Sequence, residues 1–164
     1  MSEGRGTRWL DVEQQSSWRS FVVGVTLLLD RLDADLQHDF DLSLTEYEIL
    51  VRLSERPQRQ LRMAQLADAL AHSRSRVTHT VTRMEKAGLV YRTTSPEDGR
   101  GIVCRLTDQG YDLLVAAAHV HVTGVRDYLV DRVDPADFAA LGRVMDAVSD
   151  RLIACHPEMD IRPS

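Results

Sequence analysis

The sequence has no long hydrophobic run, few aromatic residues and almost no lysine. Across its 164 residues no apolar stretch approaches the roughly 18 residues of a membrane-spanning helix, so no membrane span is expected. The segment from Met1 to Arg8 has neither an apolar core nor a cleavage pattern, so no signal peptide is expected. Lys86 is the only lysine among the 20 basic residues. These absences predict a cytoplasmic protein.

Signatures of catalysis and of metal binding are also missing. There is no phosphate-cradling glycine loop, no nucleophile elbow and no paired histidine–carboxylate motif. His119 and His121 lie two apart on a predicted helix, so they face different directions and would not share a metal. Cys104 and Cys155 are expected to be free thiols, with oxidation sensing at Cys104 as the weaker alternative. The sequence therefore predicts no enzyme, no metal site and no cofactor.

Positive charge is concentrated in one segment. Residues 56–105 contain ten basic and four acidic side chains, a net of +6. The remaining residues contain ten basic and twenty-one acidic side chains, a net of −11, which gives the overall −5. A protein that is acidic overall but basic in one segment has the electrostatic footprint of a protein that binds a polyanion.

Within this segment the pattern predicts two short helices joined by a tight turn. Apolar residues at helical spacing indicate a helix from about Met63 to Leu70. Ser73 is a good N-cap for a second helix, and Gly88 stands where a left-handed residue can end it. The buried face of this second helix is predicted from apolar residues spaced by four and three, namely Val77, Val81 and Met84.

A β-hairpin is predicted after these helices. The runs 89–94 and 102–106 are rich in β-forming residues, and residues 95–101 between them consist of turn formers. Asp98-Gly99 is expected to make the tight turn that presents Arg100. Two helices followed by such a hairpin form the pattern of a winged helix-turn-helix, a module that places one helix in the DNA major groove.

Long helices are predicted on both sides of this module. Residues 16–38 carry an apolar stripe, and a capping box at Thr45 and Glu48 begins the next helix, with a polar loop at 58–60. Thr107 caps another long helix, and Asp134-Pro135 begins a last one. The apolar positions of that last helix form a heptad seam, namely Phe138, Leu141, Met145, Val148 and Leu152.

These predictions give a mainly α fold with a small β-hairpin wing. Residues 1–15 are expected to be a flexible arm and 16–164 a single domain, with a winged helix-turn-helix lobe at 45–106 flanked by dimerisation helices at 16–38 and 107–155. The two apolar stripes exceed what a lobe of about 60 residues can bury, so a homodimer is predicted.

The second helix of the module carries the predicted DNA contacts. Outside its buried face, the helix has no acid before Glu85 and is rich in groups that bind phosphate or base edges. Its first turns should lie nearest the bases, with Arg76 forking onto a base edge, while Arg100 should enter an A·T-rich minor groove. The predicted DNA-binding residues are Arg62, Ser73, Arg74, Ser75, Arg76, Thr78, His79, Arg83, Asp98 and Arg100. The competing class, a winged helix that binds protein, predicts a mixed-charge or apolar face where Arg74, Arg76, His79 and Arg83 lie.

The order of these elements resembles the MarR family of bacterial transcription regulators. The phrases that carry the resemblance are residues 61–67, residues 77–90, and Asp98-Gly99-Arg100 followed by residues 106–110. Residues 8–10 with Trp18-Arg19 are similar to an actinobacterial branch. The resemblance implies a homodimer with intertwined terminal helices that binds a pseudo-palindromic operator in double-stranded DNA, with repression as the default outcome.

The resemblance also implies that a small-molecule effector can bind between the dimerisation helices and the DNA-binding lobe. Trp18, His38, Tyr47 and Arg52 could reach such a crevice from the first two helices. Core and interface packing is the favoured interpretation of these four side chains, so none is assigned to a ligand site.

Overall fold

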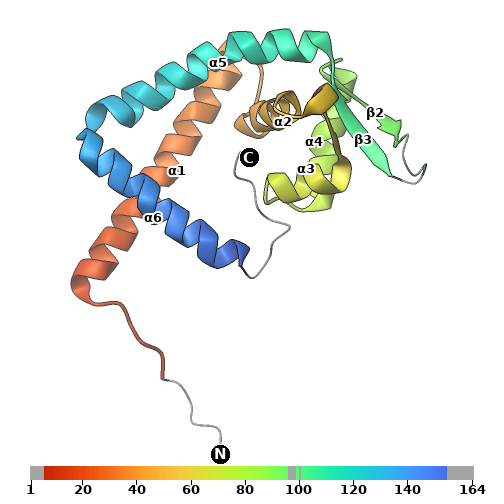
Figure 1. Cartoon of the computed structure of the whole chain (residues 1–164). Coiled ribbons are helices and arrows are strands. Elements are labelled where there is room, and N and C mark those ends of the chain that lie inside the picture. Colours follow the sequence, from red (N-terminus) through yellow and green to blue (C-terminus); the bar gives the residue numbers. More distant parts are fainter. Residues whose placement is uncertain (1–5, 96–98, 100, 155–164) are drawn as a thin grey trace, which may run out of the picture.

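The computed structural model describes residues 6–95, 99 and 101–154 (Figure 1). Helices predominate and the strands form one small sheet, which confirms the mainly α architecture. No helix among the described residues has the length and hydropathy to span a membrane. The elements, in chain order, are α1 (Val12–Phe40), α2 (Leu44–Ser54), η1 (Pro57–Arg59), β1 (Gln60–Arg62), α3 (Met63–Ala69), α4 (Arg74–Lys86), β2 (Val90–Thr94), β3 (Ile102–Leu106), α5 (Asp108–Tyr128), η2 (Val130–Arg132) and α6 (Pro135–Ile153).

Helix α1 begins earlier than the predicted residue 16. Asp11 is its N-cap: the Asp11 carboxylate accepts from the Gln14 amide at 2.8 Å, and the Gln14 side chain accepts from the Asp11 amide at 3.1 Å. This reciprocal pair satisfies backbone donors at the start of the helix, and α1 runs from Val12. The first helix therefore starts four residues earlier than the predicted residue 16.

The capping box of α2 also differs from the prediction. Ser43, rather than Thr45, is the N-cap, and its partner is Glu46 rather than Glu48. Both pairs fit the same sequence motif, so the motif alone did not choose between them. The tertiary contacts favour the earlier start, because Asp33 of α1 accepts from the Leu44 amide at 2.7 Å.

The sheet contains a strand that the sequence pattern did not predict. β1 pairs with β3, which pairs with β2, all antiparallel. Gln60, expected in a polar loop, instead lies in β1 opposite Arg105 of β3. β1 has only three residues, too few for a visible alternation, and its partner is more than forty residues away in the chain. The two predicted strands, β2 and β3, are confirmed as a hairpin.

The core lies inside the lobe formed by α2, α3, α4 and the sheet, with α5 across it. The predicted buried face of α4 is confirmed, since Val77, Val81 and Met84 are at most 1% exposed. They pack in one cluster with buried residues of the other elements, including Leu36, Ile49, Leu50, Leu53, Leu66, Val90, Cys104, Leu114 and Ala117. This shared core fixes the inner side of α4, so the outer side is left for other contacts.

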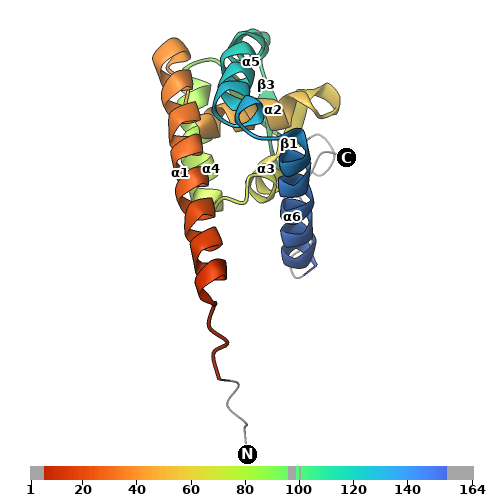
Figure 2. The same ribbon diagram turned by 90° about the vertical axis from the view of Figure 1, so that its left-hand side faces the viewer.

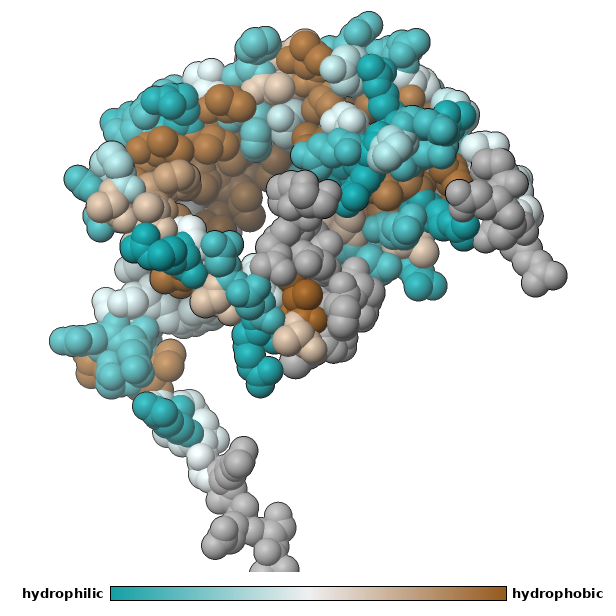
Figure 3. Space-filling model, in the orientation of Figure 1, coloured by the Kyte–Doolittle hydropathy of each residue, from teal (hydrophilic) through white to brown (hydrophobic). Residues whose placement is uncertain are grey.

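The terminal helices form a long arm beside this lobe. α5 packs along α1, and Figure 2 shows α6 standing apart from α1, although the two cross in the view of Figure 1. α6 contains no buried residue. Phe138, Val148 and Leu152 of the predicted seam are exposed, as is Trp18 of α1. Figure 3 shows brown apolar patches between hydrophilic residues on the side of the molecule where these helices lie.

Candidate nucleic-acid interface

The start of α4 is set by local sequence. Ser73 Oγ accepts from the Arg76 amide at 3.3 Å, which confirms Ser73 as the N-cap. The turn before it contains Ala71 in the left-handed region, at φ 51°, and its amide donates to the Asp68 carbonyl. At the other end the Gly88 and Leu89 amides donate to carbonyls of the last turn, with Gly88 at φ 74° as predicted.

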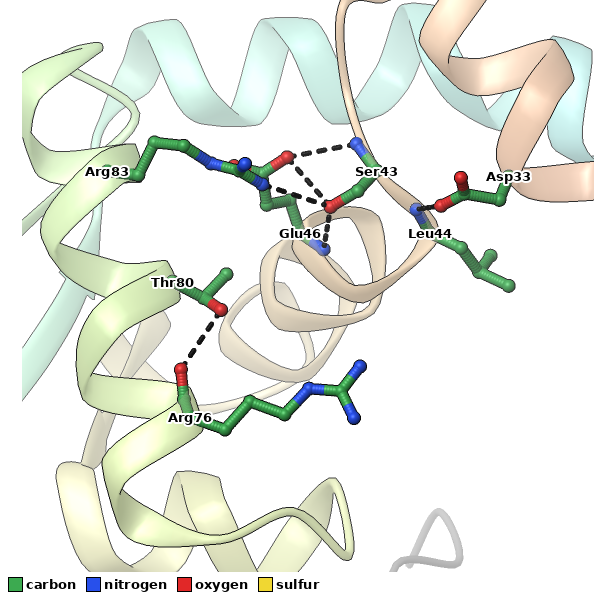
Figure 4. A network of polar contacts seen from close by, with 7 residues as sticks. All are labelled: Asp33, Ser43, Leu44, Glu46, Arg76, Thr80 and Arg83. Atoms are coloured by element: carbon green, nitrogen blue, oxygen red, sulfur yellow. Dashed lines mark hydrogen bonds and ion pairs between the residues drawn. The ribbon is translucent and has the colours of Figure 1, made fainter. Parts of the chain in front are cut away.

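The exposed residues of α4 fall on three sides of the helix. With 3.6 residues per turn, Ser75, His79 and Lys86 lie on the side opposite the buried face. All three are exposed. Arg74 and Thr78 lie on the side shared with Glu85, which contacts β2. The last side is toward α2 and consists of Arg76, Thr80 and Arg83, and Figure 4 shows both arginines extending there.

One carboxylate of α4 itself, that of Glu85, contacts the wing strand β2. Glu85 accepts from the Arg92 amide at 2.7 Å, and its other oxygen accepts from Arg92 Nε at 3.1 Å and Nη2 at 2.7 Å. The Arg92 guanidinium and amide together hold the pKa of Glu85 below its ordinary value of 4.5. The acid is therefore neutralised within the lobe and ties α4 to β2. Sequence reasoning missed this pair.

Arg83 is anchored on the opposite side of α4. Its Nε donates to Glu46 Oε1 at 2.8 Å, and its Nη2 donates to Ser43 Oγ at 3.4 Å (Figure 4). The Arg83 side chain is nevertheless 63% exposed, whereas that of Glu46 is 7% exposed. Arg83 was predicted only as a DNA contact, and Glu46 was not predicted at all, although Ser43 and Glu46 fit the capping-box motif.

The other predicted contacts take different positions. Ser73, Arg74, Ser75, Arg76, Thr78 and His79 are all exposed along the first half of α4, distributed over its three outward-facing sides. Arg62 lies apart from them at the end of β1, half-buried, with its amide donating to the Gln65 side chain at 3.3 Å. Asp98 and Arg100 lie outside the described residues. Next to them, Gly99 is left-handed at φ 63°, and the Ser95 amide donates to the Gly101 carbonyl.

The four side chains considered for an effector crevice do not share one site. Trp18 is exposed and packs on Phe21, and Arg52 pairs with Glu55 at 3.7 Å. Tyr47 is buried, with its ring 4.6 Å from that of His121. His38 lines a cavity of about 530 Å³ between α1 and α5. The burial of Tyr47 and its ring contact with His121 agree with the packing interpretation. No cluster of metal-ligating side chains occurs within the described ranges.

A second cavity lies at the junction of the arm and the lobe. Its volume is about 320 Å³, and α1, α2, α4 and α5 contribute to it through Phe40, Glu46, Arg83 and Leu113 among others. It adjoins the contact between Arg83 and Glu46. The cavity therefore lies where the arm meets α4.

Fold and surface together define a winged helix-turn-helix protein, and comparison with known proteins identifies its family. The sequence model of the MarR family matches residues 40–101. A MarR-family transcriptional regulator of Streptomyces coelicolor, Sco3205, solved in complex with DNA, is 42% identical; the match covers 90% of this chain and 92% of that one, with a TM-score of 0.86. The chain belongs to the MarR family of transcriptional regulators.

Two further relatives agree with this assignment. AbsC, another MarR-family regulator of Streptomyces coelicolor, is 38% identical, with 90% of this chain and 99% of that one covered and a TM-score of 0.85. The transcriptional regulator PecS of Dickeya dadantii is 32% identical over 106 residues, which is 64% of each chain. The chain thus spans just under two thirds of that curated relative.

Proposed function

We propose that this protein binds double-stranded DNA in a sequence-specific manner and represses transcription from the bound site. The observation that carries the proposal is the exposure of Arg74, Arg76 and His79 on the outward-facing sides of α4, while Glu85 is paired with Arg92 and Glu46 with Arg83. Phosphates attract such a surface, and donors on a helix can bind base edges in the major groove. The DNA complex of Sco3205 supports the same role here.

The three sides of α4 suggest a division of tasks. Ser75 and His79, opposite the buried face, are best placed to contact bases. Arg76 shares its side, toward α2, with Arg83. Burial raises the pKa of the Glu48 carboxylate of α2, and the charges of Arg52 and then Arg76 oppose that rise. This position favours a phosphate contact for Arg76 over the base contact expected from sequence. Arg100 of the wing is proposed to enter the minor groove, where Arg100→Ala should weaken binding most at A·T-rich flanks.

The active form is proposed to be a homodimer. Trp18 on α1 and Phe138, Val148 and Leu152 on α6 are large apolar side chains exposed in the single chain. A monomer rarely leaves a continuous apolar surface above a few hundred Å² open, so a second copy is expected to cover them. Sedimentation at low micromolar concentration should show one species near twice 18.5 kDa. A stable monomer would contradict the proposal.

A dimer with two-fold symmetry requires a pseudo-palindromic operator. Its half-sites should lie about one helical turn, or 10 base pairs, apart. Selection of bound sites from a random DNA pool should yield such a motif. The logarithm of the affinity for it should fall with the logarithm of the salt concentration, with a slope of about −0.9 per neutralised phosphate. No enriched motif and a flat salt response would instead favour a winged helix that binds protein.

Release from DNA by a small-molecule effector completes the proposal. The cavity of about 320 Å³ at the junction of arm and lobe is within the size range of small-ligand sites and is lined by both parts. A ligand there should raise the unfolding temperature and lower operator affinity, and a thermal-shift screen followed by gel shift tests both. We propose that the protein binds DNA in the cytoplasm.

A further inference from the structure

Glu46 does more than cap its own helix. Its Oε2 accepts from the Ser43 amide at 2.9 Å and from the Ser43 hydroxyl at 2.8 Å, which closes the capping box of α2. Its Oε1 accepts from Arg83 Nε at 2.8 Å across 37 positions of the chain. Capping therefore uses one carboxylate oxygen, and the other is committed to Arg83 of α4.

The contact fixes a side chain that would otherwise move. Burying a carboxylate is unfavourable unless strong donors bind both oxygens, and here the Arg83 guanidinium is the charged donor. Arg83 is 63% exposed, and an exposed arginine without an anchor samples many rotamers. The 7% exposure of the Glu46 side chain shows that the anchor itself is held within the lobe.

Arg83 retains donors for a ligand. A guanidinium has five N–H groups, of which one on Nε binds Glu46 and one on Nη2 binds Ser43. Among the described residues no partner of Nη1 is found. The other Arg–Glu pair of α4 is different, because Arg92 turns both Nε and Nη2 to Glu85 and is only 28% exposed.

We propose that Glu46 is a positioning residue for DNA binding, holding the Arg83 guanidinium so that its remaining N–H groups bind a phosphate. The inference rests on the proposed DNA-binding function. Arg83 lies seven residues beyond Arg76 on the same side, about 10 Å further along α4, and so away from the first turns that approach the bases. An arginine ordered before binding loses less entropy in the complex.

The proposal is tested by whether DNA affinity rises or falls when the negative charge of Glu46 is removed. If Glu46 acted only as a negative charge near a basic surface, Glu46→Gln would strengthen DNA binding. If it positions Arg83, Glu46→Gln should weaken binding to the selected operator by about five- to tenfold and make the salt slope shallower by about 0.9 per lost phosphate contact. Arg83→Ala should do the same, and the double variant should be no weaker than Arg83→Ala.

Asp33→Asn is the matched control. It removes one negative charge from the same network, where Asp33 accepts from the Leu44 amide, but it does not touch Arg83. Its affinity for the operator should equal or exceed that of the wild type. Arg83→Lys leaves the α2 cap intact and keeps the positive charge, but it loses the two-point anchor to Glu46 and Ser43. Its affinity for the operator should fall two- to threefold, and this test holds even if Glu46→Gln fails to fold.

The outcomes separate this inference from the proposed function. Wild-type protein that binds no DNA overturns the proposed function and this inference with it. Wild-type protein that binds with a salt-dependent affinity, together with a Glu46→Gln variant that binds equally well or more tightly, overturns the positioning role alone. So does an additive double variant, or an Arg83→Lys variant that binds as the wild type does.

Discussion

Glu85 and Arg92 join α4 to the first strand of the wing through three hydrogen bonds between two side chains and one backbone amide. Both side chains are about two-thirds buried, at 33% and 28% exposure. The pair therefore sets the position of the wing relative to the helix that is proposed to enter the major groove. Neither residue needs to contact DNA to influence how the module binds.

Loss of this pair should lower stability in a pH-dependent way. Since folding lowers the pKa of Glu85 below 4.5, its contribution is present above that pH and is lost as the pH falls through the folded-state pKa. Glu85→Gln should cost about 1 kcal/mol near neutral pH, because the pair is partly screened by solvent, and little in acid. Urea unfolding at pH 7 and at a series of more acidic pH values should show the cost of Glu85→Gln shrink as the pH falls.

The exposed pair of Arg126 and Asp131 provides the comparison. Their side chains are 59% and 46% exposed, so Asp131→Asn should change the free energy of unfolding by a few tenths of a kcal/mol at most. Equal effects of Asp131→Asn and Glu85→Gln would show that the Glu85–Arg92 pair stabilises the fold no more than an exposed ion pair does.

Arg76 and His79 should differ in what they recognise. Arg76→Ala should weaken binding to every operator variant by a similar factor and make the salt slope shallower by about 0.9 per lost contact. His79→Ala should cost about 1–3 kcal/mol and relax the preference at one position of each half-site. A panel of single-base operator changes measures both, with His119→Ala, an exposed histidine on α5, as the control. If Arg76→Ala instead relaxes the preference at one position and His79→Ala weakens binding uniformly, Arg76 contacts a base, as predicted from the sequence.

Cys104 should be unreactive in the folded protein. The residue is fully buried in β3, and burial, assisted by the nearby Glu85 charge, raises the pKa of its thiol to about 12. Almost no thiolate is then present at pH 8, so oxidation sensing at this residue is not expected. In a Cys155→Ser variant, a thiol reagent should react only after guanidinium unfolding. Fast reaction of the native variant would contradict the prediction.

Gly110 should be intolerant of alanine because its neighbour is backbone. A Cβ built there would lie 2.1 Å from the Leu89 carbonyl oxygen and 2.8 Å from a Leu106 methyl group. Gly110→Ala should therefore cost about 3 kcal/mol or more, as overpacking that the backbone cannot relieve. At Gly88 the nearest atom, 3.1 Å away, is the flexible end of Gln109, so Gly88→Ala should cost about 1 kcal/mol from its left-handed φ alone. Thermal unfolding of the two variants should preserve this order.

Local chemistry explains what could be predicted from sequence. Ser73, Gly88 and Thr107 act on backbone groups within a few residues, so the ends of α4 and the start of α5 follow from short motifs. The buried face of α4 follows from the spacing of Val77 and Val81, because helical periodicity is a property of the chain itself. These capping contacts join residues close together in the chain, and the winged helix-turn-helix pattern was recognisable from them and from the apolar spacing.

Only the tertiary structure decided how the exposed residues of α4 are divided. Sequence placed Arg76, His79 and Arg83 together as DNA contacts, whereas packing against α2 tied Arg83 to Glu46, 37 positions earlier, and packing against β2 neutralised Glu85 through Arg92. β1 likewise exists because β3 supplies its hydrogen-bond partners. Periodicity identifies which residues leave the core, but it carries no information about which distant segment each of them meets, because that depends on how the helices and strands pack in space.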